Sequence, residues 1–167
     1  MFSSYIFWLA EQSSSVQICT EFRIPGIRAL TQGGTLDQPF ILVVEDDYQL
    51  QEMIEDALGE GGFFVNTVAT AEEALTLFTG NPGAHRALVT DINLRGRLSG
   101  WDAARRVREI VPDLPVIYMT GAAGDQWPSQ GVPGSILLAK PFAPAQLVTA
   151  VSQLLTVRDA HFAGGPG

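Results

Sequence analysis

At residues 40–47 the chain reads Phe-Ile-Leu-Val-Val-Glu-Asp-Asp, an apolar run that ends in three acids. A second apolar run, residues 87–90, is followed in the same way by Asp91. Strands this apolar are typical of a parallel sheet that is covered on both faces. Since such sheets bind ligands at the carboxyl ends of their strands, we expect Glu45, Asp46 and Asp91 to meet at one edge.

These acids predict a site for a divalent cation. Neighbouring carboxylates repel one another and raise each other's pKa unless a cation joins them. Hard ions that prefer oxygen ligands relieve this repulsion, so the sequence predicts a Mg²⁺ site. One of the three acids is also a candidate nucleophile.

From residue 39 onward, short apolar strands alternate with amphipathic helices. The expected strands are bounded by turn residues and lie at 40–45, 63–68, 86–91, 115–119 and 135–139. The expected helices lie at 47–59, from the cap at Thr70 to a point before Gly80, at 100–110 and after Pro144. Thr70 and Glu73 predict a capping box, and Asp47 is expected to cap the first helix. The alternation predicts a doubly wound α/β fold with a five-stranded parallel sheet.

The segment between the last two expected strands, residues 121–134, disfavours a regular helix. Its Pro128 would cost about 3 kcal/mol inside a helix, and each glycine about 1 kcal/mol relative to alanine. Gly124 and Gly131 flank this proline. We therefore expect the fourth helix to be shortened or irregular.

Charge and cysteine content exclude several classes of function. The chain has 10 basic and 18 acidic residues, a net charge of −8, which works against a nucleic-acid partner. Its single cysteine, Cys19, cannot form an internal disulfide. The apolar stretch at residues 5–10 is too short to span a membrane and lacks a basic leader. These features predict a cytoplasmic protein whose partners are neither nucleic acids nor membranes.

The chain is expected to divide into three parts. Residues 1–38 carry no recognisable motif and are expected to form a poorly ordered extension, because termini are disordered unless contacts hold them. Their aromatic residues favour an alternative in which the segment docks on its own domain or on a partner. The domain itself is expected at 39–157, with a tail at 158–167.

Four motifs together resemble the receiver domain of bacterial two-component response regulators. They read Ile-Leu-Val-Val-Glu-Asp-Asp at 41–47, Val-Thr-Asp-Ile-Asn at 89–93, Ile-Tyr-Met-Thr-Gly at 117–121 and Leu-Ala-Lys-Pro-Phe at 138–142. The resemblance covers about residues 39–157. It implies a flavodoxin-like fold with the strand order 2-1-3-4-5, and a role in phosphorelay signal transduction.

The resemblance also implies a role for each acid. Asp91 would be the phosphoacceptor, attacking a phosphoryl group carried on a histidine, a reaction for which carboxylates are competent nucleophiles. Asp46, Asp91 and the backbone carbonyl of Asn93 would bind Mg²⁺, and Glu45 would act close by, through water. The phosphoryl donor would be a histidine kinase or a histidine phosphotransfer protein.

Two further residues would contact the phosphoryl group. Lys140 would pair with a phosphate oxygen, and Thr120 would donate its hydroxyl to the phosphoryl group. The bond from Lys140 to Pro141 is the expected place for a cis peptide. Such a protein is not an enzyme in the usual sense, although it would catalyse its own phosphoryl transfer and dephosphorylation. Because little chain follows residue 157, the resemblance implies a stand-alone receiver that acts on a downstream protein target through direct contact.

The sequence departs from the family pattern in one loop length and at two positions. Between Asp91 and Gly100 it has one residue more than the chemotaxis-type pattern, so this loop is expected to be longer. Arg95 stands where proline is common, and Leu137 stands where many receivers have an aromatic residue. Without that aromatic residue, the usual coupling of the threonine to an aromatic rotamer cannot operate. The other charged groups predict ordinary surface: His85 and His161 are expected to be exposed, and the arginines at 95, 97, 105, 106 and 108 to form a solvated face.

Two other functions remain open. A pseudo-receiver would bind partners without phosphorylation, but such domains normally lack part of the acid set, which is intact here. An aspartyl phosphatase of the haloacid dehalogenase type also has a doubly wound core. It needs an acidic residue at the position that Asn93 occupies, so the sequence disfavours it.

Overall fold

The computed structural model describes residues 40–163, with side chains described up to residue 160, so the predictions for residues 1–38 lie outside the described residues. Within this range five parallel strands form one sheet in the order β2-β1-β3-β4-β5. The strands are β1 (Phe40–Val44), β2 (Phe64–Val68), β3 (His85–Asp91), β4 (Val116–Thr120) and β5 (Ile136–Ala139). The doubly wound α/β fold and its predicted strand order are confirmed.

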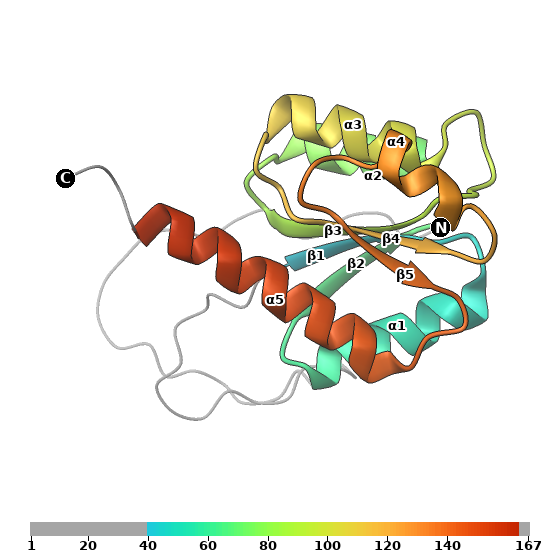
Figure 1. Cartoon of the computed structure of the whole chain (residues 1–167), viewed down its shortest axis with the longest axis horizontal. Coiled ribbons are helices and arrows are strands. Elements are labelled where there is room, and N and C mark those ends of the chain that lie inside the picture. Colours follow the sequence, from blue (N-terminus) through green and yellow to red (C-terminus); the bar gives the residue numbers. More distant parts are fainter. Residues whose placement is uncertain (1–39, 164–167) are drawn as a thin grey trace, which may run out of the picture. The chain divides into compact units, whose positions relative to one another are not determined.

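Two pairs of helices cover the two faces of the sheet (Figure 1). On one face α2 (Ala71–Gly80) packs beside α3 (Gly100–Ile110), and on the other α1 (Tyr48–Glu60) packs beside α5 (Pro144–Ala163). None of the helices in residues 40–163 combines the length and the apolar character needed to cross a membrane.

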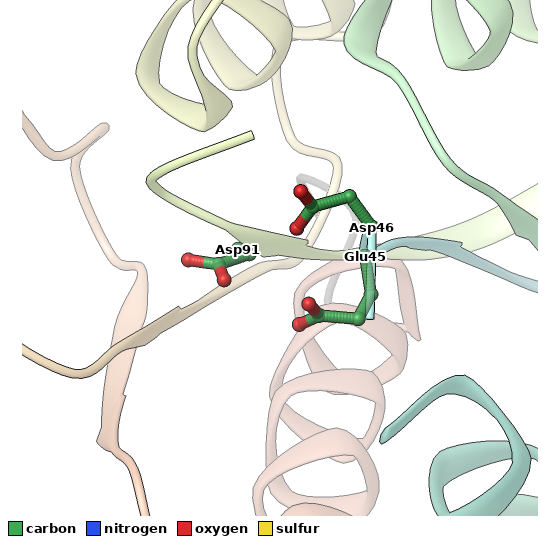
Figure 2. Close-up of side chains that lie close together, drawn as sticks. All are labelled: Glu45, Asp46 and Asp91. Atoms are coloured by element: carbon green, nitrogen blue, oxygen red, sulfur yellow. The ribbon is translucent and has the colours of Figure 1, made fainter. Parts of the chain in front are cut away.

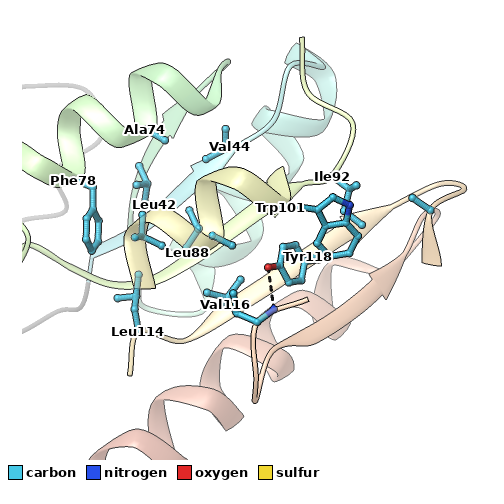
Figure 3. Packing of buried hydrophobic residues seen from close by; sticks show 14 residues of the cluster. Leu42, Val44, Ala74, Phe78, Leu88, Ile92, Trp101, Leu114, Val116 and Tyr118 are labelled. Atoms are coloured by element: carbon cyan, nitrogen blue, oxygen red, sulfur yellow. Dashed lines mark hydrogen bonds between the residues drawn. The ribbon is translucent and has the colours of Figure 1, made fainter. Parts of the chain in front are cut away.

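Successive side chains of β1 and β3 point to opposite faces, and both faces are buried. Leu42 and Leu88 pack against Phe78 on the side of α2 and α3 (Figure 3). Ile41 points to the opposite face, where it belongs to a separate hydrophobic cluster that includes Leu147 of α5. The alternation follows from the pleat of the strand, and because both faces are buried, the middles of β1 and β3 are apolar.

Side-chain caps begin the helices on the first face. Thr70 accepts a hydrogen bond from the Glu73 N–H at 3.2 Å, as expected for an N-cap. The Glu73 carboxylate, however, accepts from the N–H of Ala69 and not from that of Thr70, so the predicted capping box is not formed. The reciprocal box occurs instead at the start of α3, between Ser99 and Asp102.

Between β4 and β5 the chain forms only short helical turns, which confirms the predicted irregularity. A 3-10 turn, Gly124–Gln126, leads into the four-residue α4, Trp127–Gln130. α4 is followed by Gly131, where a Cβ atom would lie 2.5 Å from the Trp127 ring. The tight return of the chain therefore requires a glycine at this position.

Side chains from β4 and α3 hold this irregular segment in place. The buried Tyr118 hydroxyl accepts a hydrogen bond from the Val132 N–H at 3.3 Å, and its ring packs on Trp101 (Figure 3). Arg108 donates to the carbonyl of Pro133 at 3.0 Å. The prediction that Arg108 belongs to a solvated face is therefore wrong, because its guanidinium is half-buried against this loop.

His85 is buried, so the prediction that it lies on the surface is also wrong. Its ring stacks on Phe78, with 6.1 Å between the ring centroids. Its Nε2 lies 2.9 Å from the Asn66 amide nitrogen, while Nδ1 is buried without a hydrogen-bond partner among the described residues. Burial lowers the pKa of His85, because the imidazolium form would lose its hydration.

We expect His85→Gln to reduce the loss of stability in mild acid. Since the folded-state pKa is lowered, the unfolded chain binds the proton first, and the wild type loses stability as the pH falls below about 6.5. Through this one group, the free energy of unfolding can change by at most about 1.4 kcal/mol per pH unit. Urea unfolding of both proteins at pH 7.5 and 5.5 checks this. An equally large loss in the variant would contradict it.

Candidate functional site

Three carboxylates lie together at the carboxyl edge of the sheet (Figure 2). Glu45 and Asp46 follow β1, Asp91 ends β3, and one oxygen of each lies within 4.8 Å of the others. Val44 of β1 pairs with Thr90 of β3, so the next residue of each strand leaves the sheet beside the other. The strand register therefore places three acids in one small volume.

Lys140 lies between two of these acids. Its Nζ is 2.5 Å from an Asp91 oxygen and 2.7 Å from a Glu45 oxygen. Its backbone N–H donates to the Thr120 carbonyl at 2.7 Å, which ties the end of β5 to the end of β4. The peptide bond from Lys140 to Pro141 is cis, as expected. The only lysine of the chain thus bridges two acids at the ends of neighbouring strands.

Burial and ion pairing act in opposite directions on these groups. Burial raises the pKa of Glu45, and the two interactions with Lys140 that favour its ionised form do not fully offset this. Burial alone would lower the pKa of Lys140, but its hydrogen bonds to Asp91 and Glu45 outweigh that effect, so the net shift is upward. The lysine is therefore held in its charged form, whereas Glu45 ionises less readily than a free glutamate.

Asp46 has a different cationic partner, Arg95. The Arg95 Nε lies 2.8 Å from an Asp46 oxygen, although the arginine side chain is 85% exposed. Arg95 belongs to the loop between β3 and α3, residues 92–99, which also contains Asn93. The Asn93 N–H donates to an Asp91 oxygen at 3.0 Å. Sequence reasoning missed the ion pair, and its only signal was an arginine where receivers commonly have proline.

Two contacts hold this loop in place. At its end, Gly100 lies so close to β3 that a Cβ atom would be 2.0 Å from the Asp91 carbonyl oxygen. In its middle, Glu72 of α2 accepts a hydrogen bond from the Arg97 N–H at 3.0 Å. Backbone hydrogen bonds, from Glu72's own N–H and from that of Arg97, lower the pKa of the Glu72 carboxyl. The loop is thereby attached to both β3 and α2.

Thr120 is buried at the end of β4, one residue beyond the β4 residue that pairs with Asp91. Its hydroxyl oxygen accepts hydrogen bonds from the N–H groups of Ala122 at 3.2 Å and Ala123 at 2.8 Å. These bonds use the oxygen as an acceptor, so the hydroxyl hydrogen can still be donated to an incoming group.

The donor atoms of the acid cluster fit a hard divalent cation. Mg²⁺ binds oxygen at about 2.1 Å, so ligand oxygens on its opposite sides lie about 4.2 Å apart. The three carboxylates, with oxygens within 4.8 Å of one another, need only small movements to reach that spacing. Within the described part of the chain no histidine or cysteine joins this group, so its chemistry favours Mg²⁺ over softer metals.

Comparison with known protein families and sequences gives a consistent answer. The family model described as "Response regulator receiver domain" matches residues 41–152. The chain is 39% identical over 111 residues to the "Response regulator receiver protein Anae109_2439" of Anaeromyxobacter sp. (strain Fw109-5), covering 66% of this chain and 43% of that protein. It is 30% identical over 112 residues to the "C4-dicarboxylate transport transcriptional regulatory protein DctD" of Rhizobium meliloti, covering 66% of this chain and 24% of that protein. The chain therefore spans less than half the length of these curated relatives.

Solved structures show the same likeness. A response regulator receiver protein from Sinorhizobium medicae is 41% identical and has a TM-score of 0.71, and the match covers 74% of this chain and 99% of that one. A response regulator receiver domain protein from Clostridium thermocellum is 27% identical with a TM-score of 0.68, covering 73% and 98% of the two chains.

Proposed function

Because this chain belongs to the response regulator receiver domain family, whose members act in phosphorylation-dependent signalling, we propose that it accepts a phosphoryl group on Asp91. The donor would be a histidine kinase or a histidine phosphotransfer protein. The observation that carries the proposal is the Lys140 ammonium, 2.5 Å from an Asp91 oxygen at an edge that gathers three carboxylates. This arrangement would supply a nucleophile, a cation for the phosphate and oxygen ligands for a metal.

In the proposed reaction the Asp91 carboxylate attacks phosphorus, the bond from phosphorus to the donor's histidine nitrogen breaks, and an acyl phosphate forms. Asp46, Asp91 and the backbone carbonyl of Asn93 would hold Mg²⁺, with Glu45 acting through water. When bound, this ion offsets the repulsion between the anionic nucleophile and the anionic phosphate.

Lys140 and Thr120 would then receive the phosphoryl oxygens. The lysine would exchange its contact with Asp91 for a contact with a phosphate oxygen. Of the 10 basic residues of the chain, Lys140 is the single lysine and the other nine are arginines. A lysine here suits the role, because its compact ammonium acts as a point charge towards phosphate. The Thr120 hydroxyl, whose hydrogen is available to donate, supports the second contact.

The two alternatives are less well supported. A pseudo-receiver that binds proteins without phosphorylation has no need for a complete acid set with a paired lysine, and that set is present here. A phosphatase of the haloacid dehalogenase type would need an acid at Asn93. Phosphate release from generic phosphate monoesters separates the phosphatase from the two receiver functions, because only a phosphatase would release phosphate continuously.

We expect the protein to gain a phosphate-sized adduct when it is incubated with acetyl phosphate and Mg²⁺, and intact mass spectrometry measures this. Asp91→Asn should abolish the adduct, because an amide is not a competent nucleophile, and Asp46→Asn should reduce it strongly. Asp113→Asn is the matched control, an exposed aspartate that should leave the adduct unchanged. An adduct that persists in Asp91→Asn, or its absence from the wild type, would contradict phosphorylation of Asp91.

The partner proteins would contact the surface around this edge. A groove next to the site is lined by Leu50 and Met53 of α1 and by Lys140, Pro141 and Phe142 after β5. Its apolar rim beside the lysine is suited to the donor protein, which must bring a phosphohistidine to Asp91. The output would be contact with a downstream protein target, in the cytoplasm, without nucleic acid or membrane as a partner.

A further inference from the structure

We propose that Arg95 is an internal counter-ion that competes with Mg²⁺ for Asp46. The inference rests on the metal site of the proposed function and adds a residue that this function does not use. Its basis is the contact of 2.8 Å between the Arg95 Nε and an Asp46 oxygen. Asp46 is also one of the three acids whose oxygens face one another at the edge. The Arg95 guanidinium is therefore paired with a carboxylate that a divalent cation would bind.

The charges of the site favour an exchange between the two cations. Three carboxylates paired with Lys140 and Arg95 leave a net charge of −1. If a divalent cation takes the place of Arg95, the sum of −3, +1 and +2 is zero. Once the divalent cation is present, the attraction that holds the guanidinium is cancelled, and the two cations repel each other. Simultaneous occupation is therefore unfavourable.

Arg95 can leave Asp46 at small cost. The arginine side chain is 85% exposed, whereas the Asp46 side chain is only 17% exposed. Solvent and salt screen the charge of an exposed guanidinium, and holding a long side chain in one geometry costs entropy, so a pair of this kind is weak. The contact is thus suited to reversible competition, in which it lowers the apparent affinity for the metal without blocking the site.

The loop that carries Arg95 is built to present it to Asp46. Gly96, the next residue, has φ +129°, a backbone conformation that side-chain-bearing residues rarely adopt. A Cβ atom on Gly96 would lie 2.9 Å from a Glu72 oxygen, and the same carboxylate accepts the Arg97 N–H. Glu72 therefore holds the loop immediately after Arg95, which reduces the entropy lost when the ion pair forms.

The test is a Mg²⁺ titration of the full-length protein, followed by backbone amide NMR shifts. This readout does not depend on phosphorylation. For Arg95→Ala the dissociation constant for Mg²⁺ should fall about two- to fivefold at low ionic strength, the range expected when an exposed ion pair no longer competes. The matched control is Arg97→Ala, which removes the same charge from the same loop while keeping the backbone N–H that Glu72 binds. It should change the constant by less than about 1.5-fold, because its charge is not on Asp46.

The outcomes separate this inference from the one on which it rests. If Mg²⁺ binds more tightly only to Arg95→Ala, and if this gain is smaller in 0.5 M KCl, the counter-ion role is supported, because salt screens an exposed pair. Equal constants for the wild type and Arg95→Ala, or equal tightening in both variants, would overturn the counter-ion role while leaving the metal site intact. If Mg²⁺ shifts no amide in any of the three proteins, the metal site itself fails, and the counter-ion role fails with it.

Discussion

Gly100→Ala is expected to destabilise the protein by about 3 kcal/mol, the upper part of the range for overpacked interiors. The added Cβ would lie 2.0 Å from the Asp91 carbonyl oxygen and 2.8 Å from its carbonyl carbon. Both are backbone atoms of β3, so no side-chain rotation can relieve the contact. α3 must move away from the sheet, although alanine is intrinsically the better helix former by about 1 kcal/mol.

The matched control for this prediction is Gly59→Ala in α1, where a Cβ atom would meet nothing within 4 Å. It should stabilise the protein by about 0.5–1 kcal/mol, because only the backbone entropy of the unfolded chain changes. Urea unfolding at pH 7.5 measures both. A Gly100→Ala variant as stable as the wild type would show that α3 can shift without cost. That result would undermine the inference that the close approach of Gly100 to β3 holds the end of the loop 92–99 in place.

The sheet and the place of the site could be predicted because both depend on local patterns. Strands buried on both faces read as nearly continuous apolar runs, so acids next to them are expected where the strands end. Val44 is followed by Glu45, and Thr90 by Asp91, and parallel pairing then brings these acids together. The irregular fourth helix could be predicted for a similar reason, since Pro128 and its flanking glycines disfavour a helix whatever surrounds them.

What could not be predicted depends on tertiary partners. His85 looks like a loop residue beside Gly83, but β3 begins at His85, and the ring is covered by Phe78. Arg108 resembles its exposed neighbours on α3 until the return of the chain near Pro133 offers it a carbonyl acceptor. Arg95, in the loop after β3, pairs with Asp46, which follows β1, and no spacing in the sequence encodes that contact.

Lys140→Met is expected to cost about 3 kcal/mol of stability at pH 8 without metal, because removing one partner of a buried ion pair leaves the other charge uncompensated. Here two acids are left without their cation, the nearly inaccessible Glu45 and the partly buried Asp91. Methionine keeps most of the volume and the apolar stem of the lysine, so the loss would reflect charge more than packing. Mg²⁺ should recover part of this stability, since it would supply positive charge to the same carboxylates.

The pH dependence of this loss identifies its cause. Burial already raises the pKa of Glu45, and without Lys140 the pKa should rise further, so the folded variant binds a proton more readily than its unfolded chain. A folded-state pKa above the unfolded value means that stability is lost as the pH rises through it and regained as the pH falls. The difference in unfolding free energy between wild type and variant should therefore shrink from pH 8 to pH 5.

The control for that comparison is Arg86→Met, which breaks an ion pair to Asp159 whose two side chains are 34% and 61% exposed. An exposed pair contributes at most about 1 kcal/mol, so this variant should show a small loss that hardly changes over the same pH range. A Lys140→Met difference that stays constant or widens towards pH 5 would mean that packing, and not the buried acids, causes the loss. A difference that shrinks only for Lys140→Met assigns the loss to the two acids that Lys140 pairs with, Glu45 and Asp91.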